Sequence, residues 1–344
     1  MKEYKNIQNR NYLVDNLKVI LIFAVVFGHT IEYYINQNDI LRGAYIYIYI
    51  FHMPLFVFIS GYLSKKSTKS NEDIVRKLLI PYIFFNTLWY IGVYLATGIN
   101  MFSIVYPGWT LWYLISLFFW RLSLKYIINI KFIIPISFIL GLLIGLDKMG
   151  EDFLSLSRTI VFLPFFLIGY YTNETYFKKI NNINKGIGSF IVIIFIIIAM
   201  YIAKYEIIDY KFLYNSHAYD TNNLSVLEGI ISRIILYISS IILSVGVISL
   251  MPSKKVFYSK YGKNTMNVYV FHIYLIVIVL GIIPRWDINL ISNIIILISP
   301  VIIFAMLSLE FVKKIYDFIF NPINNIFGYI LSLIKSLYYK FVKI

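Results

Sequence analysis

The stretch YLVDNLKVILIFAVVFGHTIEYYI, residues 12–35, decides the fold of this chain. Between Lys18 and His29 it holds only uncharged and mostly apolar residues. A helix over the whole stretch would be about 36 Å long, enough to cross a hydrocarbon core of about 30 Å. We therefore predict a membrane-spanning helix near residues 16–35, with charged groups near both of its ends.

Similar apolar runs recur along the chain, and the composition agrees with them. Of the 344 residues, 60% are hydrophobic and 14% are charged, whereas a soluble domain carries about 25% charge. These values exclude an ordinary soluble enzyme, a disordered chain and a nucleic-acid-binding module. We predict an all-α polytopic membrane protein with about ten spans. The runs lie near 16–35, 43–63, 78–97, 107–124, 132–147, 158–173, 187–204, 229–250, 265–284 and 289–312.

Lys and Arg residues are concentrated in every second segment between these runs, and this pattern predicts how the chain is oriented in the membrane. One set of segments, including both chain ends, carries 24 of the 31 Lys and Arg residues. The other set holds Arg42, Lys148, Arg158, Lys204, Lys211, Arg233 and Arg285. Because cytoplasmic loops are enriched in Lys and Arg, both termini are predicted to be cytoplasmic. The net charge of +14 then belongs to a membrane surface, and no nucleic-acid partner is expected.

The chain divides into an integral membrane domain, 1–315, and a tail, 316–344. The tail mixes aromatic and aliphatic residues with sparse Lys, a pattern typical of an amphipathic helix lying on the inner leaflet. Multi-pass insertion into a cell membrane follows from the spans. The composition, rich in Ile, Asn, Lys and Tyr, indicates a bacterial source, and the oligomeric state is not predicted.

One face of the first helix carries a polar stripe. Lys18 and His29 are 11 residues apart, close to three full turns, so His29 lies about 16 Å further along the same face. Asp15 shares this face, and Glu32 follows His29 by about one turn. An ionisable group at membrane depth is costly and is therefore a functional candidate. We interpret His29 as a proton-transferring histidine, although it could also be a packing residue.

His52 and His272 also lie within predicted spans, and for them the functional and packing interpretations stay balanced. His217 lies in an outer loop and is expected to be solvated. The chain has no Cys, and no histidine pair has the spacing of a helical metal site, so no metal is predicted. Trp112 belongs to an aromatic cluster that either anchors a helix at the interface or lines a sugar-binding cleft.

Six segments, taken together, resemble the membrane-bound acyltransferase-3 family, in its fucose 4-O-acetylase-like branch. They are Tyr12–Lys18 with Phe27–His29, Phe51–Tyr62, Arg76–Tyr82, Leu111–Leu114, Ser157–Tyr171 and Gly262–His272. They follow the order of the family along most of the chain. The family has Arg, ten residues, then the catalytic His, and here Lys18 replaces the Arg before His29. The family's double arginine is reduced to Arg76 and Lys77.

This resemblance implies ten spans and an O-acyltransferase that uses acetyl-CoA from the cytoplasm. The implied acceptor is a sugar hydroxyl of an extracytoplasmic polysaccharide or of a lipid-linked glycan. His29 is then the expected general base, with Lys18 and Asp15 as further catalytic candidates. Arg76 and Lys77 are expected to bind the phosphates of coenzyme A. The expected acceptor-binding residues are Glu32, His52, Trp112, Arg158 and His272.

Two other classes stay open from the residues alone. Polar groups on several spans also fit a transporter or flippase of a glycan precursor, although no internal repeat typical of transporters is visible. A structural membrane protein would use its histidines only for packing. Arg158 could equally be an arginine at a helix end that extends its charge to the interface.

Overall fold

The computed structural model describes residues 10–65, 70–282 and 290–342, and within these ranges it contains helices and loops but no β-strand. The longer helices are α2 (Tyr12–Ile31), α3 (Asp39–Ser64), α5 (Ile80–Thr97), α6 (Trp112–Ile127), α7 (Ile133–Leu143), α8 (Leu156–Tyr171), α10 (Lys185–Tyr205), α11 (Val226–Leu250), α12 (Thr265–Ile282), α13 (Leu290–Leu307) and α14 (Glu310–Val342). The short ones are α4 (Asn71–Ile74), α9 (Glu174–Asn181), the π-helix η2 (Val75–Leu79), and the 3-10 turns η1 (Glu32–Tyr34), η3 (Ile144–Leu146), η4 (Phe153–Ser155), η5 (Tyr210–Tyr214), η6 (Asp220–Asn222) and η7 (Ser259–Lys263).

Each of the ten predicted apolar runs overlaps a helix, which confirms a helical, multi-pass membrane protein. By length and hydropathy, the described residues include six candidate spans, Tyr12–Tyr34, Asp39–Ser64, Asn71–Thr97, Phe153–Tyr171, Lys185–Tyr205 and Val226–Leu250. A seventh is the pair α13 and α14, bent by 59°. The apolar helices Ile133–Leu146 and Thr265–Gly281 are shorter. The count of ten stays a prediction, and Lys2, Lys5 and Arg285 lie outside the described residues.

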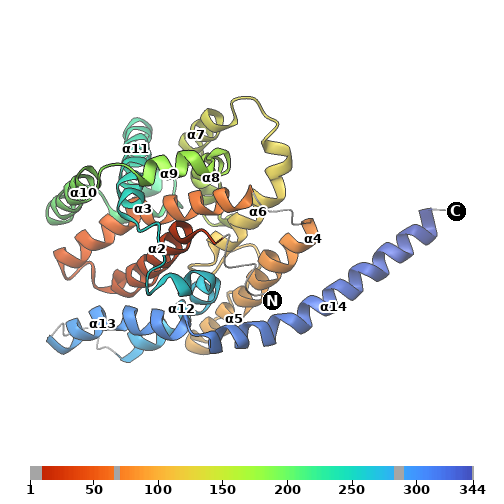
Figure 1. Cartoon of the computed structure of the whole chain (residues 1–344). Helices are drawn as coiled ribbons and strands as arrows, with labels where there is room; N and C mark the ends of the chain where they lie inside the picture. Colours follow the sequence, from red (N-terminus) through yellow and green to blue (C-terminus); the bar gives the residue numbers. More distant parts are fainter. Residues whose placement is uncertain (1–9, 66–69, 283–289, 343–344) are drawn as a thin grey trace.

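Helix α2 lies at the centre of the molecule and packs against α3, α12 and α13 (Figure 1). Helix α3 in turn runs along α8. A Cβ atom at Gly61 of α3 would lie 1.9 Å from the carbonyl oxygen of Phe166 in α8, so only glycine permits this approach. The core thus surrounds the helix that carries the predicted polar stripe.

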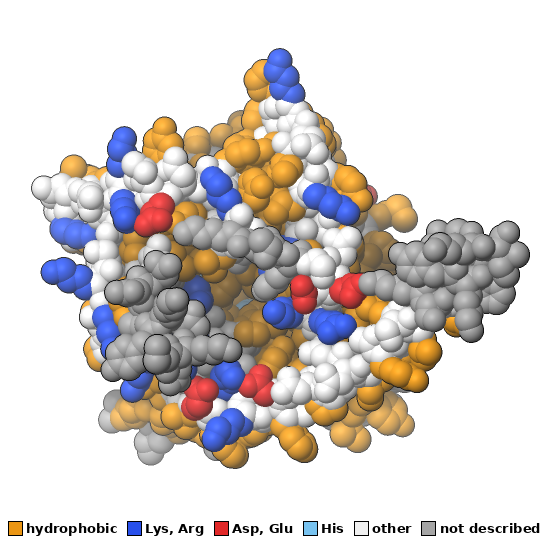
Figure 2. Space-filling view, turned by 45° about the vertical axis from the view of Figure 1, so that its right-hand side comes forward, with side chains coloured by type: hydrophobic (Ala, Val, Ile, Leu, Met, Phe, Trp, Pro, Cys, Tyr) orange, Lys and Arg blue, Asp and Glu red, His pale blue; other side chains and the backbone are white. Residues whose placement is uncertain are grey.

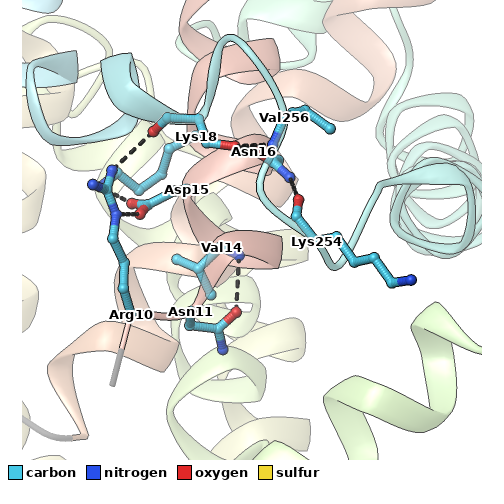
Figure 3. Close-up of polar contacts among 9 residues, drawn as sticks. Arg10, Asn11, Val14, Asp15, Asn16, Lys18, Lys254 and Val256 are labelled. Atoms are coloured by element: carbon cyan, nitrogen blue, oxygen red, sulfur yellow. Dashed lines mark hydrogen bonds and ion pairs between the residues drawn. The ribbon is translucent and has the colours of Figure 1, made fainter. Parts of the chain in front are cut away.

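The N-terminal end of α2 is fastened to the loop between α11 and η7 (Figure 3). Asn16 is fully buried, and its amide nitrogen donates to the carbonyls of Pro252 at 2.8 Å and Lys254 at 3.0 Å. Its amide oxygen accepts from the hydroxyl of Ser259 at 2.6 Å. Nearly all of the hydrogen-bonding capacity of the Asn16 side chain is therefore used. The helix itself begins at Asn11, whose side chain accepts a hydrogen bond from the amide of Val14.

The right-hand side of Figure 1, where α4 and the end of α14 lie, is turned forward in Figure 2. This face carries many Lys and Arg side chains, with a few acidic ones, around a hollowed centre in which apolar side chains are visible (Figure 2). Helix α14 projects away from the remaining helices (Figure 1). The expected tail boundary at residue 316 lies inside α14, which begins at Glu310.

Candidate active site

A pocket at the C-terminal end of α2 brings together residues from five parts of the chain. We call it the histidine pocket, and it contains about 550 Å³ of space, part of it open to the surroundings. Its walls are formed by His29, Glu32, Tyr49, His52, Met53, Trp109, Trp112, Arg158, Phe162, Leu213 and Tyr214. Five of the predicted site residues, His29, Glu32, His52, Trp112 and Arg158, therefore share one pocket.

His29 and Glu32 form the polar centre of this pocket. Nδ1 of His29 lies 3.0 Å from Oε2 of Glu32, because α2 continues into η1 and places the two residues on one face. The other carboxylate oxygen accepts from the hydroxyl of Tyr214 at 3.1 Å. Tyr214 in turn accepts from the hydroxyl of Tyr45 at 3.1 Å. The carboxylate is thus held from two sides, and it fixes the ring orientation of His29.

The two other membrane histidines are buried beside His29. Nδ1 of His52 donates to the carbonyl of Ile48 at 2.8 Å, and Nδ1 of His272 donates to that of Tyr269 at 2.6 Å. In both rings this leaves Nε2 as the free nitrogen. Nε2 of His272 has no hydrogen-bond partner within the described part of the chain, and its ring centroid lies 5.6 Å from that of His29. The three predicted histidines therefore lie close together.

Arg158 lies in the wall of the pocket. Its guanidinium carbon is 5.2 Å from the ring centroid of Trp112, and its Nε donates to the carbonyl of Tyr214 at 3.1 Å. The contact with an aromatic face and the hydrogen bond both fix the guanidinium plane. Trp112 is 9% exposed, so it lines the pocket and is not an anchor at the molecular surface.

The loop before α6 brings a second tryptophan to the pocket. The ring centroid of Trp109 is 5.7 Å from that of His29. The buried side chain of Asn86 supports this loop, since it donates to the carbonyl of Ser103 and accepts from the amide of Gly108, both at 2.7 Å. Trp109 has a φ of 22°, a backbone conformation that is costly for a residue with a side chain.

Two further cavities lie beside the histidine pocket along α2. The first, the middle cavity, shares His29, Met53 and Trp112 with the pocket. The second, the lysine cavity, is lined by Lys18 and contains about 570 Å³ of space, including its open part. The middle and lysine cavities have Phe56, Tyr113 and Tyr269 in common. The cavities therefore follow one another from Lys18 to His29.

The remaining predicted residues lie elsewhere. Asp15 pairs with Arg10 at 2.5 Å and with Lys18 at 3.4 Å (Figure 3). It precedes His29 by 14 residues, about 21 Å along the helix, so Glu32 and not Asp15 contacts that histidine. Arg76 lies 5.8 Å from the ring of Phe327 in α14. Lys77 is exposed beside it.

Several residues of the site were not predicted. Tyr49 lies one turn before His52, and that spacing could have indicated it. Tyr214 comes from a loop with no periodic pattern, so no signal in the sequence marks it. His217, expected to be solvated, keeps 30% of its side chain exposed and also lies 3.2 Å from Glu151 of another loop. Within the described ranges, no group of three His, Asp or Glu side chains could hold a metal ion.

Comparison with known proteins identifies the family of this chain. The family model Acyl_transf_3, an acyltransferase domain, matches residues 11–310. The chain belongs to this acyltransferase family. The resemblance seen in the sequence is thereby confirmed, and the matched range includes every residue of the histidine pocket.

Two curated relatives match part of the acyltransferase. Nodulation protein NolL of Mesorhizobium japonicum is 40% identical over 89 residues, and the protein of the same name from Sinorhizobium fredii is 38% identical over 89 residues. Each match covers 23% of this chain and 24% of the relative, so about a quarter of either relative is represented. No solved structure matches the acyltransferase significantly.

Proposed function

We propose that this acyltransferase moves an acetyl group from cytoplasmic acetyl-CoA to a sugar hydroxyl at the outer side of a bacterial cell membrane. The observation that carries the proposal is the position of His29. Its side chain lines both the histidine pocket and the middle cavity, which leads on to the lysine cavity. A donor entering beside Lys18 and an acceptor entering beside Arg158 would meet at this imidazole.

The contacts of His29 fit a general base. Since Nδ1 faces the carboxylate of Glu32, Nδ1 carries the proton and Nε2 has a free lone pair. Nε2 takes the proton of the sugar hydroxyl while the sugar oxygen bonds to the thioester carbonyl carbon. The C–S bond then breaks, and the thiolate of coenzyme A takes the proton back from the imidazolium. Glu32 stabilises the imidazolium between these two steps.

The histidine pocket suits a sugar acceptor. The faces of Trp109 and Tyr49 offer flat apolar surfaces, and the guanidinium of Arg158 offers hydrogen-bond donors. A pocket with aromatic walls and few polar groups is typical of small-molecule sites. His52 contributes a further polar edge of the pocket, whereas His272 is buried beside His29 and does not line the pocket.

The opposite end of the cavities suits the donor. Ten spans with both termini in the cytoplasm would place Lys18 and the basic face of Figure 2 there. Lys18 lines the lysine cavity and is expected to contact the donor, while Asp15 keeps its ammonium group in place. Arg76 and Lys77 are expected to attract the phosphates of coenzyme A. The C-terminal part of α14 would lie on the same leaflet.

Transfer of radiolabelled acetyl groups tests the proposal. Membranes containing the wild type, His29→Ala or the matched histidine variant His217→Ala would receive labelled acetyl-CoA and the host's surface glycan. We expect label in the glycan with the wild type and His217→Ala, and a loss of about a thousandfold or more with His29→Ala. Equal transfer by all three would overturn the role of His29. Translocation of a lipid-linked glycan without any donor would instead favour a flippase.

A further inference from the structure

A fourth cavity, the isoleucine groove, opens beside the histidine pocket, and the mechanism above does not use it. It lies between α3, α10, α11 and η5 and contains about 770 Å³ of space, including its open part. Its floor consists of the buried side chains of Ile46 and Ile50. At its rim Ile198 is 41% exposed and Ile235 is 57% exposed. The groove therefore opens sideways, between helices that we assign to the membrane.

The packing of α10 against α11 gives this groove its direction. A Cβ atom at Gly188 would lie 2.0 Å from Oγ of Ser249, and one at Gly246 would lie 2.8 Å from Cγ2 of Ile191. These close contacts lie at the start of α10 and the end of α11. The groove is lined by later residues of α10 and earlier residues of α11. The two helices thus touch near the predicted cytoplasmic side and enclose the groove toward the outer side.

The groove also lies directly beside the candidate active site. Leu213 lines both the groove and the histidine pocket. Tyr210 lines the groove, and its ring centroid is 6.1 Å from that of Tyr214 in the pocket wall. Along α10 the groove extends from Ile202 to Phe195, about 10 Å, a depth comparable to that of one leaflet of about 15 Å.

We infer that the isoleucine groove holds the hydrocarbon chain of the acceptor, so that the substrate is a sugar carried on a lipid. This inference rests on the proposed function and selects the lipid-linked class of acceptor over a free polysaccharide. The chain would enter from the outer leaflet between α10 and α11, and the sugar would pass Leu213 to reach His29. Each buried methylene group contributes about 0.8 kcal/mol, so two of them change affinity about tenfold.

Photolabelling tests the groove without measuring activity. The probe is a dodecyl glucoside with a diazirine in its alkyl chain, added to the purified full chain in nanodiscs. The double variant Ile198→Trp with Ile235→Trp fills the groove. The control, Ile197→Trp with Ile234→Trp, changes the same residue type one position earlier, at exposed sites outside the groove. We expect labelled peptides from α3, α10 and α11 in the wild type and control, and about tenfold less label in the groove variant.

A transfer assay separates this inference from the proposed function. Methyl and dodecyl glycosides of the sugar that the wild type acetylates are compared, and the dodecyl glycoside is expected to react at least about tenfold faster. The groove variant should lose this preference but keep the rate with the methyl glycoside. Equal rates with both glycosides overturn the lipid-linked acceptor yet leave the acyltransferase proposal intact. Groove labelling by a diazirine phospholipid that the glycoside does not displace also overturns the inference, since bulk lipid then occupies the groove. Transfer that does not depend on His29 overturns the proposed function instead.

Discussion

Oε2 of Glu32 lies 3.0 Å from Nδ1 of His29, and the second oxygen of the same carboxylate accepts a hydrogen bond from Tyr214 at 3.1 Å. The partner of the histidine therefore comes from the 3-10 turn η1 that continues α2, and Tyr214 of the 3-10 turn η5, in the middle part of the sequence, holds that partner in place. Such an arrangement of imidazole, carboxylate and hydroxyl fixes the orientation of the His29 ring, so that Nδ1 faces Glu32 and Nε2 faces away from it.

The first prediction concerns this carboxylate. Glu32→Gln keeps the shape of the side chain but removes the charge that stabilises the imidazolium, so kcat should fall about a hundredfold or more. The KM for acetyl-CoA should not change, because Glu32 lies in the histidine pocket and not in the lysine cavity. Steady-state kinetics measure both constants. Glu206→Gln, at an exposed glutamate that pairs with Arg42, is the control, and an equal kcat in both variants would contradict the prediction.

The second prediction concerns the acceptor side of the pocket. Arg158→Lys removes the planar group that lies over Trp112 and donates to the carbonyl of Tyr214. Lysine cannot reproduce both contacts, so the KM for the acceptor should rise about tenfold, as expected for about 1.4 kcal/mol. The KM for acetyl-CoA should stay constant. Arg42→Lys, outside the pocket, should change neither value, and a change in the donor KM alone would disprove the assignment.

The third prediction concerns stability at the N-terminal end of α2. Asn16→Ala leaves the carbonyls of Pro252 and Lys254 and the buried hydroxyl of Ser259 without this partner. The free energy of unfolding should therefore fall by about 2–3 kcal/mol. Thermal unfolding in detergent measures the difference. Asn100→Ala is the matched control, because Asn100 is exposed and its side chain accepts one hydrogen bond, from Phe102. Equal unfolding temperatures for both variants would argue against the assigned role of Asn16.

The fourth prediction is a pH dependence in the loops outside the membrane helices. Burial alone would raise the pKa of Glu151, but hydrogen bonds from Thr221, the amide of Ala218 and His217 outweigh it and lower the pKa. The carboxylate therefore stabilises the loops fully above the unfolded value of about 4.3. This stabilisation is lost as the pH falls through the lower pKa of the folded state.

Hydrogen exchange measures this effect directly. The segment 215–221 should be protected at pH 6 and should lose protection at pH 3, after correction for the intrinsic exchange rates. Glu151→Gln should show weak protection at both pH values, because it lacks the charge that the three donors contact. Protection that is equal at both pH values in the wild type would contradict the prediction.

The spans were predictable because membrane burial demands long apolar runs, and each run shows in the sequence. The polar stripe of α2 was predictable for the same reason, since charged residues inside such a run are rare. The beginning of α6 was placed too early, at residue 107. Pro107 and Gly108 interrupt the pattern there, and the helix begins only at Trp112.

Some residues of the pocket wall could not be predicted from the sequence. Tyr214 stands 182 positions after Glu32, and only the packing of the 3-10 turns η5 and η1 against α3 brings the two together. Asn16 resembles an ordinary polar residue at a helix start, and its three partners become visible only when the loop at 252–259 is in place. Contacts of this kind depend on tertiary packing and leave no periodic pattern in the sequence.

The hydrogen bonds of Asn16 have a consequence for the opposite end of its helix. They tie α2 to the segment that leads into α12, and these two helices carry His29 and His272, whose rings are 5.6 Å apart. Asn16 and His29 are separated by 13 residues, about 20 Å of helix. Because α2 and α12 also pack against each other, a fixed contact at one end limits how far the two histidine rings can move apart. The side-chain amide of Asn16 thereby helps to fix the distance between the rings of His29 and His272.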